Sequence, residues 1–115
     1  MSAAPAPLAN EASPMEPDEI EATAGEVFLR RLAANGVDYF FANGGTDFAP
    51  IIEGFAHAQV AGFKVPTPVL VPHETAALGM AHGYYLATGK PQAVMVHTNV
   101  GLANCVMGLI NAASD

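Results

Sequence analysis

The chain is poor in charge and especially in basic residues. Only 13% of its 115 residues are charged, and four Lys and Arg residues stand against eleven Asp and Glu residues, for a formal net charge of −7. Since there is no basic cluster, we expect neither a nucleic-acid partner nor an anionic membrane surface. Apolar residues make up 51% of the sequence, so the low charge indicates surface that a partner or further chain covers.

The sequence also lacks a membrane span, a targeting segment and a pair of cysteines. No apolar run approaches the roughly 20 residues that a transmembrane helix needs. The N-terminus has neither the basic start of a signal peptide nor the arginines of a transit peptide. The single cysteine, Cys105, excludes an internal disulfide. We therefore expect a cytoplasmic protein, and we expect Cys105, on the fourth predicted helix, to have a packing role rather than a reactive one.

Acidic residues are concentrated near the N-terminus. Residues 1–22 hold five of the eleven acids, four prolines and no Lys or Arg. This composition is typical of a disordered leader. We therefore expect the folded domain to occupy residues 23–115.

The remaining sequence alternates helical and strand patterns. Helices are expected from Thr23 to the Asn35-Gly36 stop, from 46 or 47 to about 58, from 73 or 74 to 88, and from 101 to 113, with strands over 37–41, 69–71 and 93–96. Short strands without alternation, separated by helices, predict a parallel sheet covered on both faces, which is a three-layer α/β/α domain. Right-handed crossovers then place the carboxyl ends of the strands at one edge.

Glycines and polar residues follow each predicted strand. They occupy residues 43–46, 73–74 and 97–101. Because open α/β proteins bind ligands at the carboxyl edge of the sheet, the sequence predicts a binding site there. The glycines form neither a dinucleotide fingerprint nor a phosphate-binding loop, which counts against a small nucleotide-binding domain.

Glu74 is the leading candidate for chemistry. A carboxylate at a strand-to-helix junction, followed by alanines, is partly desolvated and suited to sharing a proton with a ligand nitrogen. The alternative is a helix-start acid that faces water and is stabilised by the helix dipole. In the helix that follows, Gly79 and Gly83 are four residues apart and allow another helix to approach closely.

The four histidines differ in context. His97 ends an apolar strand and is either a substrate-side acid or base or a structural histidine bonded to a neighbouring loop. We read His73 as a spacer, and His57 and His82 as ordinary helix residues. Their spacing is not that of a zinc site and one cysteine adds little, so we expect no metal ligands in this chain.

Taken in order, these stretches resemble the N-terminal, pyrimidine-binding (PYR) domain of thiamine diphosphate-dependent enzymes, in the acetolactate synthase and benzoylformate decarboxylase group. The stretches that carry the resemblance are Gly36-Val37, Asn43-Gly44-Gly45-Thr46, His73-Glu74-Thr75-Ala76-Ala77, Met80-Ala81-His82-Gly83-Tyr84, Thr88-Gly89-Lys90-Pro91, Gly101-Leu102-Ala103-Asn104, Gly108-Leu109 and Asn111-Ala112. Each stretch is common by itself, whereas their order and spacing together are specific.

The resemblance implies roles for individual residues. Glu74 matches the glutamate that binds N1′ of the cofactor's aminopyrimidine and favours the imino form, whose N4′ removes the thiazolium C2 proton. His97 matches an active-site histidine of the decarboxylases that acetolactate synthases lack, and Thr46 matches a serine that faces substrate. The other residues expected to contact the cofactor are Gly44, Gly45, Gly101 and Asn104.

The resemblance also implies partners. The element that holds Mg²⁺ and the diphosphate belongs to a separate domain that nothing here matches, and the resemblance stops at Asp115, before the end of a PYR domain. We therefore expect a partial domain that shares thiamine diphosphate with the diphosphate-binding domain of another subunit, in a homo-oligomer acting on 2-oxo acids. FAD in the full enzyme is left open. The alternative is a non-catalytic or split PYR-like subunit that binds and regulates a partner.

Overall fold

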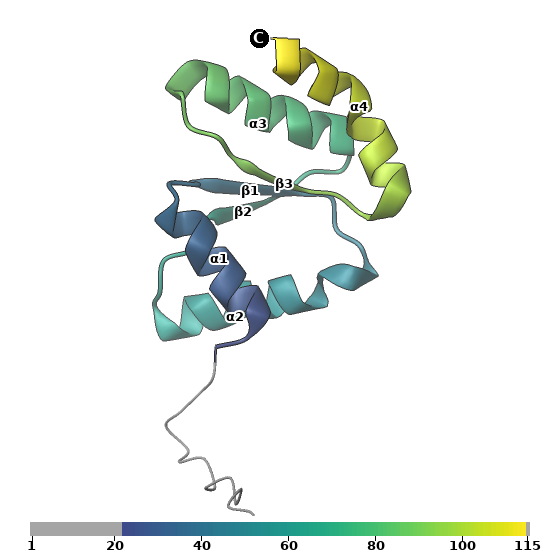
Figure 1. Ribbon diagram of the computed structural model, residues 1–115. Coiled ribbons are helices and arrows are strands. Elements are labelled where there is room, and N and C mark those ends of the chain that lie inside the picture. The colour runs from purple at the N-terminus through teal and green to yellow at the C-terminus, as the bar shows by residue number, and fades with distance from the viewer. Residues whose placement is uncertain (1–21, 115) are drawn as a thin grey trace, which may run out of the picture.

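The computed structural model describes residues 22–114, drawn in colour in Figure 1. Apart from Ala22, the expected leader lies outside these residues. The helices are α1 (Ala24–Ala34), α2 (Ala49–Ala61), α3 (Glu74–Thr88) and α4 (Thr98–Ser114). The strands are β1 (Tyr39–Ala42), β2 (Thr67–Leu70) and β3 (Ala93–Met95), and a 3₁₀ turn, η1 (Thr46–Phe48), leads into α2.

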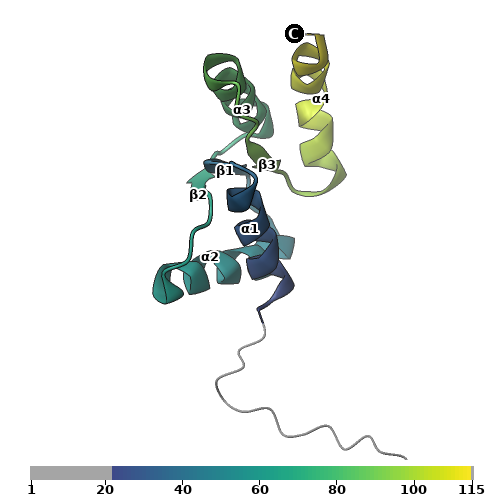
Figure 2. The ribbon, with the colours of Figure 1, turned by 60° about the vertical axis from the view of Figure 1, so that its left-hand side comes forward.

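The three strands form one parallel sheet in the order β2-β1-β3. Ala42 at the end of β1 pairs with Leu70 on one side and with Met95 on the other, so all three carboxyl ends lie at the same edge. α1 and α2 lie on one face of the sheet, and α3 and α4 lie on the other (Figures 1 and 2). The predicted three-layer α/β/α arrangement with a parallel sheet is confirmed.

The chain leaves the carboxyl edge in two directions. The segment after β1 leads to α2 on one face, whereas the segments after β2 and β3 lead to α3 and α4 on the other (Figure 1). In open α/β sheets, ligands bind where neighbouring connections diverge in this way. The geometry of the sheet thus makes the residues after the three strands the natural place for a site.

The core lies on both faces of β1, because successive side chains of a strand point to opposite sides. On the α3 side, the buried cluster comprises Phe41, Val71, Ala77 and Ala81. On the other side, Phe40 packs edge-to-face against Phe55 of α2, with ring centroids 5.5 Å apart. The alanines of α3 are small enough to let that helix lie directly on the sheet, which sets the position of its first residue.

Helix ends follow their local signals. Thr23 caps α1, and its hydroxyl oxygen accepts a hydrogen bond from the Glu26 backbone N–H at 3.2 Å. The Glu26 carboxylate contacts Arg30 at 3.1 Å and His57 at 2.8 Å. Gly89 ends α3 in the left-handed conformation, with φ of 71°, as predicted.

Several boundaries differ from the sequence-based prediction, among them the start of β1, which is Tyr39 rather than residue 37. β2 begins at Thr67 and includes Pro68, which the prediction placed in a loop. An edge strand tolerates proline because one side of its backbone has no strand partner. α4 begins at Thr98, three residues before Gly101, and Thr98 adopts a left-handed φ of 54° that turns the chain from β3 directly into the helix.

α2 begins at Ala49, later than predicted, because residues 46–48 form the tighter η1 turn. Pro50 stands in the first turn of α2, where its missing N–H leaves no helical bond unmade. The Pro50 carbonyl oxygen lies against Gly25 of α1, where a Cβ would collide with it. This close contact brings α1 and α2 together beneath the sheet.

Large apolar side chains remain exposed on α4. They are Val100, Leu102, Val106, Met107, Leu109 and Ile110, and we call them the α4 apolar surface. Successive helical residues are 100° apart, so these six side chains lie within one half of the helix circumference. Across residues 22–114, no helix has both the length and the apolar character needed to cross a membrane.

Candidate functional site

Glu74 is the first residue of α3 and is buried, with 8% of its surface exposed. His73 caps the helix: its Nδ1 accepts a hydrogen bond from the Thr75 backbone N–H at 3.2 Å. The carboxylate is thus held at the carboxyl edge of the sheet, beside the end of β2. This burial excludes the reading of Glu74 as a helix-start acid that faces water.

Asn104 of α4 holds the Glu74 carboxylate in place. Its Nδ2 donates a hydrogen bond to Glu74 Oε2 at 3.0 Å. The carbonyl oxygen of Asn104 accepts a second bond, from Thr75 Oγ1 at 2.8 Å. The two bonds join the start of α3 to α4, so the position of the carboxylate depends on how these helices pack.

Hydrogen bonds keep Glu74 ionised. The bond from Asn104 is the largest influence, followed by the bond from the backbone N–H of Glu74 itself, and the Asn43 side chain contributes as well. Together they lower the pKa of Glu74, although burial acts in the opposite direction. The chain therefore presents a charged carboxylate at the strand edge.

Gly101 gives α4 room to pass close to this carboxylate. A Cβ at position 101 would lie 3.3 Å from Glu74 Oε1 and 3.0 Å from Val96 Cβ. The atoms nearest to Gly101 therefore belong to Glu74 and to Val96, which lies in the connection between β3 and α4. A larger residue at this position would push the helix away from the carboxylate.

His97 follows β3 and contacts the segment after β1. Its Nδ1 lies 2.7 Å from Oδ1 of Asp47, in η1. The ring occupies the space beside Gly45, where a Cβ would overlap it. Both partners are accessible, with 39% of the His97 side chain and 54% of the Asp47 side chain exposed. The contact joins the ends of two neighbouring strands.

The structure brings some of the predicted site residues into contact and leaves others apart. Glu74, Gly101 and Asn104 form one contact group, and His97 and Gly45 belong to a second. Gly44 is exposed, and a Cβ there would meet only a Phe48 side-chain atom, at 3.9 Å. Thr46 is exposed at the start of η1.

Sequence reasoning missed Asn43 and Asp47 as site residues. Both lie in the segment that follows β1, where the prediction used position 47 only as a possible start of the second helix. The sequence did contain a signal for them, because the amide of Asn43 and the carboxylate of Asp47 stand on either side of the two glycines after β1. Which side chains they would meet follows only from the β1-β3 pairing.

Cys105 is buried beneath the site, with 4% of its surface exposed. Its Sγ lies 3.7 Å from the Glu74 backbone carbonyl oxygen and donates a weak hydrogen bond to it. Burial first, and then the charge of Glu74, raises the pKa of the Cys105 thiol. The thiol is therefore neutral and packs inside the domain, as predicted. Residues 22–114 contain no group of three or more His, Cys, Asp or Glu residues arranged to hold a metal ion.

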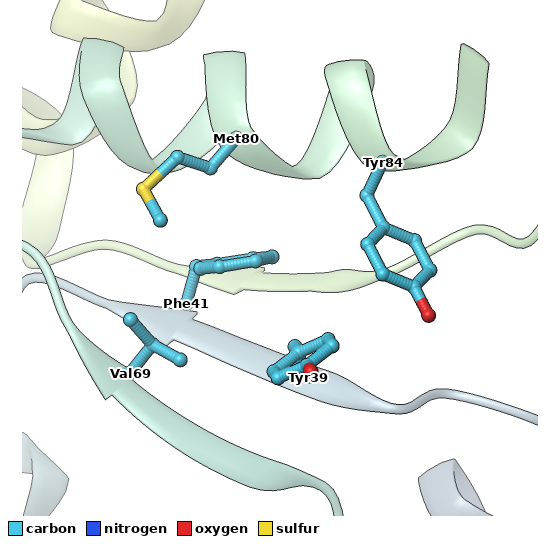
Figure 3. A pocket seen from close by; sticks show the side chains of 5 residues that line it. All are labelled: Tyr39, Phe41, Val69, Met80 and Tyr84. Atoms are coloured by element: carbon cyan, nitrogen blue, oxygen red, sulfur yellow. The ribbon is translucent and has the colours of Figure 1, made fainter. Parts of the chain in front are cut away.

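A separate cavity of about 370 Å³ lies beside α3, over the sheet (Figure 3). It is lined by Tyr39, Phe41, Val69, Met80 and Tyr84. At one end, Asp38 Oδ2 accepts hydrogen bonds from the Tyr84 hydroxyl at 2.9 Å and from Lys90 Nζ at 3.3 Å, which lower the pKa of Asp38. Since Asp38 precedes β1, this end of the cavity lies at the edge of the sheet opposite Glu74.

Comparison with known proteins identifies one family model and several curated relatives that match this chain. The model of the family "Thiamine pyrophosphate enzyme, N-terminal TPP binding domain" matches residues 22–115. The chain is 30% identical to the mitochondrial acetolactate synthase catalytic subunit of Saccharomyces cerevisiae, over 88% of the chain and 14% of the relative. It is 33% identical to a sulfoacetaldehyde acetyltransferase of Alcaligenes xylosoxydans xylosoxydans, over 78% of the chain and 14% of the relative. It is 32% identical to a probable 2-ketoarginine decarboxylase of Pseudomonas aeruginosa, over 89% of the chain and 17% of the relative.

The chain thus spans about one seventh of the length of the curated relatives that it matches. No solved structure gives a significant match.

Proposed function

The chain belongs to the thiamine pyrophosphate enzyme family through its N-terminal TPP binding domain, and on that premise we propose that it binds the aminopyrimidine half of thiamine diphosphate through Glu74. The observation that carries the proposal is the buried Glu74 carboxylate at the carboxyl edge of the sheet, held there by the hydrogen bond from Asn104. The domain would form the N-terminal part of an enzyme that decarboxylates or condenses 2-oxo acids.

The residues at this edge fit such a ring. A protonatable ring nitrogen needs a carboxylate that is charged, fixed and accessible at one oxygen. Asn104 donates a hydrogen bond to Oε2 of Glu74 at 3.0 Å, which fixes the carboxylate. Because Asn104 and Asn43 favour the ionised form, Glu74 is ready to accept a hydrogen bond from the ring.

Thiamine diphosphate supplies, when bound, a nucleophilic thiazolium carbon and a ring that takes up electrons from the bond that breaks. The part assigned to this chain is the movement of one proton. Glu74 shares the proton of the aminopyrimidine N1′, and Asn104 keeps the carboxylate aimed at it. A glutamine at position 74 would hold the ring but would not exchange a proton.

We assign the substrate side to His97 and Thr46. His97 lies at the same sheet edge as Glu74 and is partly exposed, so it is accessible to a ligand there. A 2-oxo acid as substrate is supported by the relative named for 2-ketoarginine, which is a 2-oxo acid. Gly44 is exposed and has no side chain, so its backbone is accessible to a ligand at this edge.

We further propose that the cofactor's diphosphate and Mg²⁺ are held by a diphosphate-binding domain of another subunit in a homo-oligomer. The α4 apolar surface supports this, because six large exposed apolar side chains on one helix are typical of a surface that another chain covers. By itself, the chain is expected to bind thiamine diphosphate weakly.

The alternative is a PYR-like subunit without catalysis that regulates a partner. An interaction module needs an apolar surface, and it has no need for a buried carboxylate held by an amide. The hydrogen bonds around Glu74 therefore favour the enzyme.

The test is the exchange of the cofactor's C2 proton for deuterium in the assembled enzyme. Loss of the proton-sharing carboxylate in Glu74→Gln is expected to slow exchange and turnover by about 10²- to 10⁴-fold, the usual contribution of a general acid or base. Glu53→Gln, at an exposed position of α2, is the matched control and leaves exchange unchanged. Near-normal C2 exchange in Glu74→Gln would remove the basis of the proposal.

A further inference from the structure

The contact between His97 and Asp47 determines where the histidine carries its proton. His97 Nδ1 and Asp47 Oδ1 are 2.7 Å apart. An ionised carboxylate only accepts hydrogen bonds, so Nδ1 must be the donor. When the ring is neutral, its single N–H is therefore on Nδ1 and the other ring nitrogen, Nε2, has a free lone pair.

The neighbouring backbone fixes the position of the ring. Gly45 provides the space that the His97 ring fills, since a Cβ at position 45 would overlap Nδ1, Cγ and Cε1. Thr98, the next residue after His97, has a positive φ of 54°, which is rare for a β-branched residue. Strained backbone of this kind is found where the surroundings hold a side chain in one place.

We propose that Asp47 is a positioning residue for His97: it keeps the proton of the neutral ring on Nδ1, so that Nε2 serves as a proton acceptor at the carboxyl edge. The contact spans the ends of β1 and β3, the neighbouring strands whose connections leave toward opposite faces of the sheet. That the ligand there is a 2-oxo acid rests on the proposed function, whereas the protonation pattern of the ring does not.

The chain contains internal references for this pattern. His73 Nδ1 accepts a hydrogen bond from the Thr75 backbone N–H, so the proton of neutral His73 is on Nε2, opposite to His97. His57 Nδ1 lies 2.8 Å from the carboxylate of Glu26, so His57 has the same pattern as His97. One spectrum of the unmodified chain should therefore contain both kinds of ring.

Long-range ¹H–¹⁵N correlation spectra of the ¹⁵N-labelled 115-residue chain test the proposal without cofactor. They are recorded about two pH units above the ordinary histidine pKa of about 6.5, where a free imidazole is neutral. We expect protonated Nδ1 and unprotonated Nε2 for His97, and the reverse for His73. His→Gln variants assign each ring.

Asp47→Ala is expected to abolish the Nδ1–H pattern of His97 and to leave those of His57 and His73 unchanged. Glu53→Ala, which removes an exposed acid elsewhere, is the matched control and changes none of them. Gly45→Ala is the second variant, and it should displace the His97 ring while Asp47 is intact. Backbone amide shifts confirm that each variant is folded.

A His97 ring with its proton on Nε2 in the unmodified chain, or one unaffected by Asp47→Ala, would overturn the proposal. Either result would leave the proposed function standing, since that depends on C2 exchange and Glu74. Conversely, normal C2 exchange in Glu74→Gln would overturn the function and leave the His97 pattern as an established property of the edge.

Discussion

At the scale of single residues, the edge of the sheet holds two carboxylates with different environments. Glu74 is buried and is held by amide and backbone donors, which stabilise its charge. Asp47 is exposed and contacts a histidine. The first is suited to sharing a proton with a ligand, and the second is suited to orienting a neighbouring ring.

Removal of the amide donor should change the titration of Glu74. The Asn104 side chain contributes most to the lowered pKa of Glu74, so Asn104→Ala is expected to raise that pKa. Carboxyl ¹³C shifts followed through an acid titration measure it directly. Asn111→Ala, at an exposed position of the same helix, is the control and should leave the titration unchanged. An unaltered titration in Asn104→Ala would show that the amide does not stabilise the charge.

The lowered pKa values of Asp38 and Glu74 also predict how stability depends on pH. A carboxyl group whose pKa is lower in the folded than in the unfolded state contributes stability that is present above the unfolded value. That contribution is lost as the pH falls through the folded value. The free energy of unfolding should therefore decrease below about pH 5, and urea titrations at several pH values measure it. Asp38→Asn and Glu74→Gln should each flatten this dependence, and a curve unchanged in both variants would contradict the assignment.

At the scale of elements, the two helices that frame the site contain glycines in different settings. Gly108 of α4 packs against α3, and a Cβ there would lie 2.6 Å from Leu78 Cδ2. At Gly79 and Gly83 of α3, a Cβ would meet nothing within 4 Å. Within the described residues, the close contact between α3 and α4 is therefore at Gly108. The predicted approach of another helix at Gly79 and Gly83 stays a prediction.

This difference predicts opposite effects of the same substitution. Gly79→Ala should stabilise the isolated chain by about 0.5–1 kcal/mol, because alanine is the better helix former. Gly108→Ala gains the same propensity, but crowding of a packed contact typically costs about 1–3 kcal/mol, so it should be the less stable variant. Urea unfolding of both proteins gives the comparison.

A Leu78→Ala background provides the control, because there the difference between the two variants should shrink. If Gly79→Ala also impairs assembly with a diphosphate-binding domain, that would support the predicted helix approach at this position.

At the scale of the whole molecule, apolar surface and low charge belong together. Only 13% of residues are charged, and α4 exposes six large apolar side chains on one half of its circumference. An uncovered patch of this kind is typical of an interaction surface. The chain by itself should therefore associate as its concentration rises.

Sedimentation velocity over a range of concentrations tests this association. Met107→Lys places a charge within the α4 apolar surface and should weaken the association by at least about tenfold, because a lysine buried without a partner is costly. Val60→Lys is the matched control, since Val60 is 87% exposed on α2, away from that surface, and should leave association unchanged. Equal behaviour of the two variants would place the contact elsewhere.

Most of the fold was predictable from local signals. Thr23 and Gly89 mark helix ends by their own chemistry, and apolar runs separated by helices specify a covered parallel sheet. The errors fell where tertiary context decides. Pro68 is accepted because β2 is an edge strand, and Thr98 begins α4 because the turn out of β3 holds it in an unusual conformation.

The sequence by itself determined the family, the order of the elements and the position of Glu74 at a strand-to-helix junction, because each depends on residue types at fixed spacing. Only the tertiary structure decided that Asn104 holds the carboxylate and that Asp47 meets His97. These pairs are separated by 30 and 50 residues, and their contacts arise from helix packing and strand pairing. Spacing along the chain says nothing about such distances, since they depend on how β1, β3 and the two helices of one face come together.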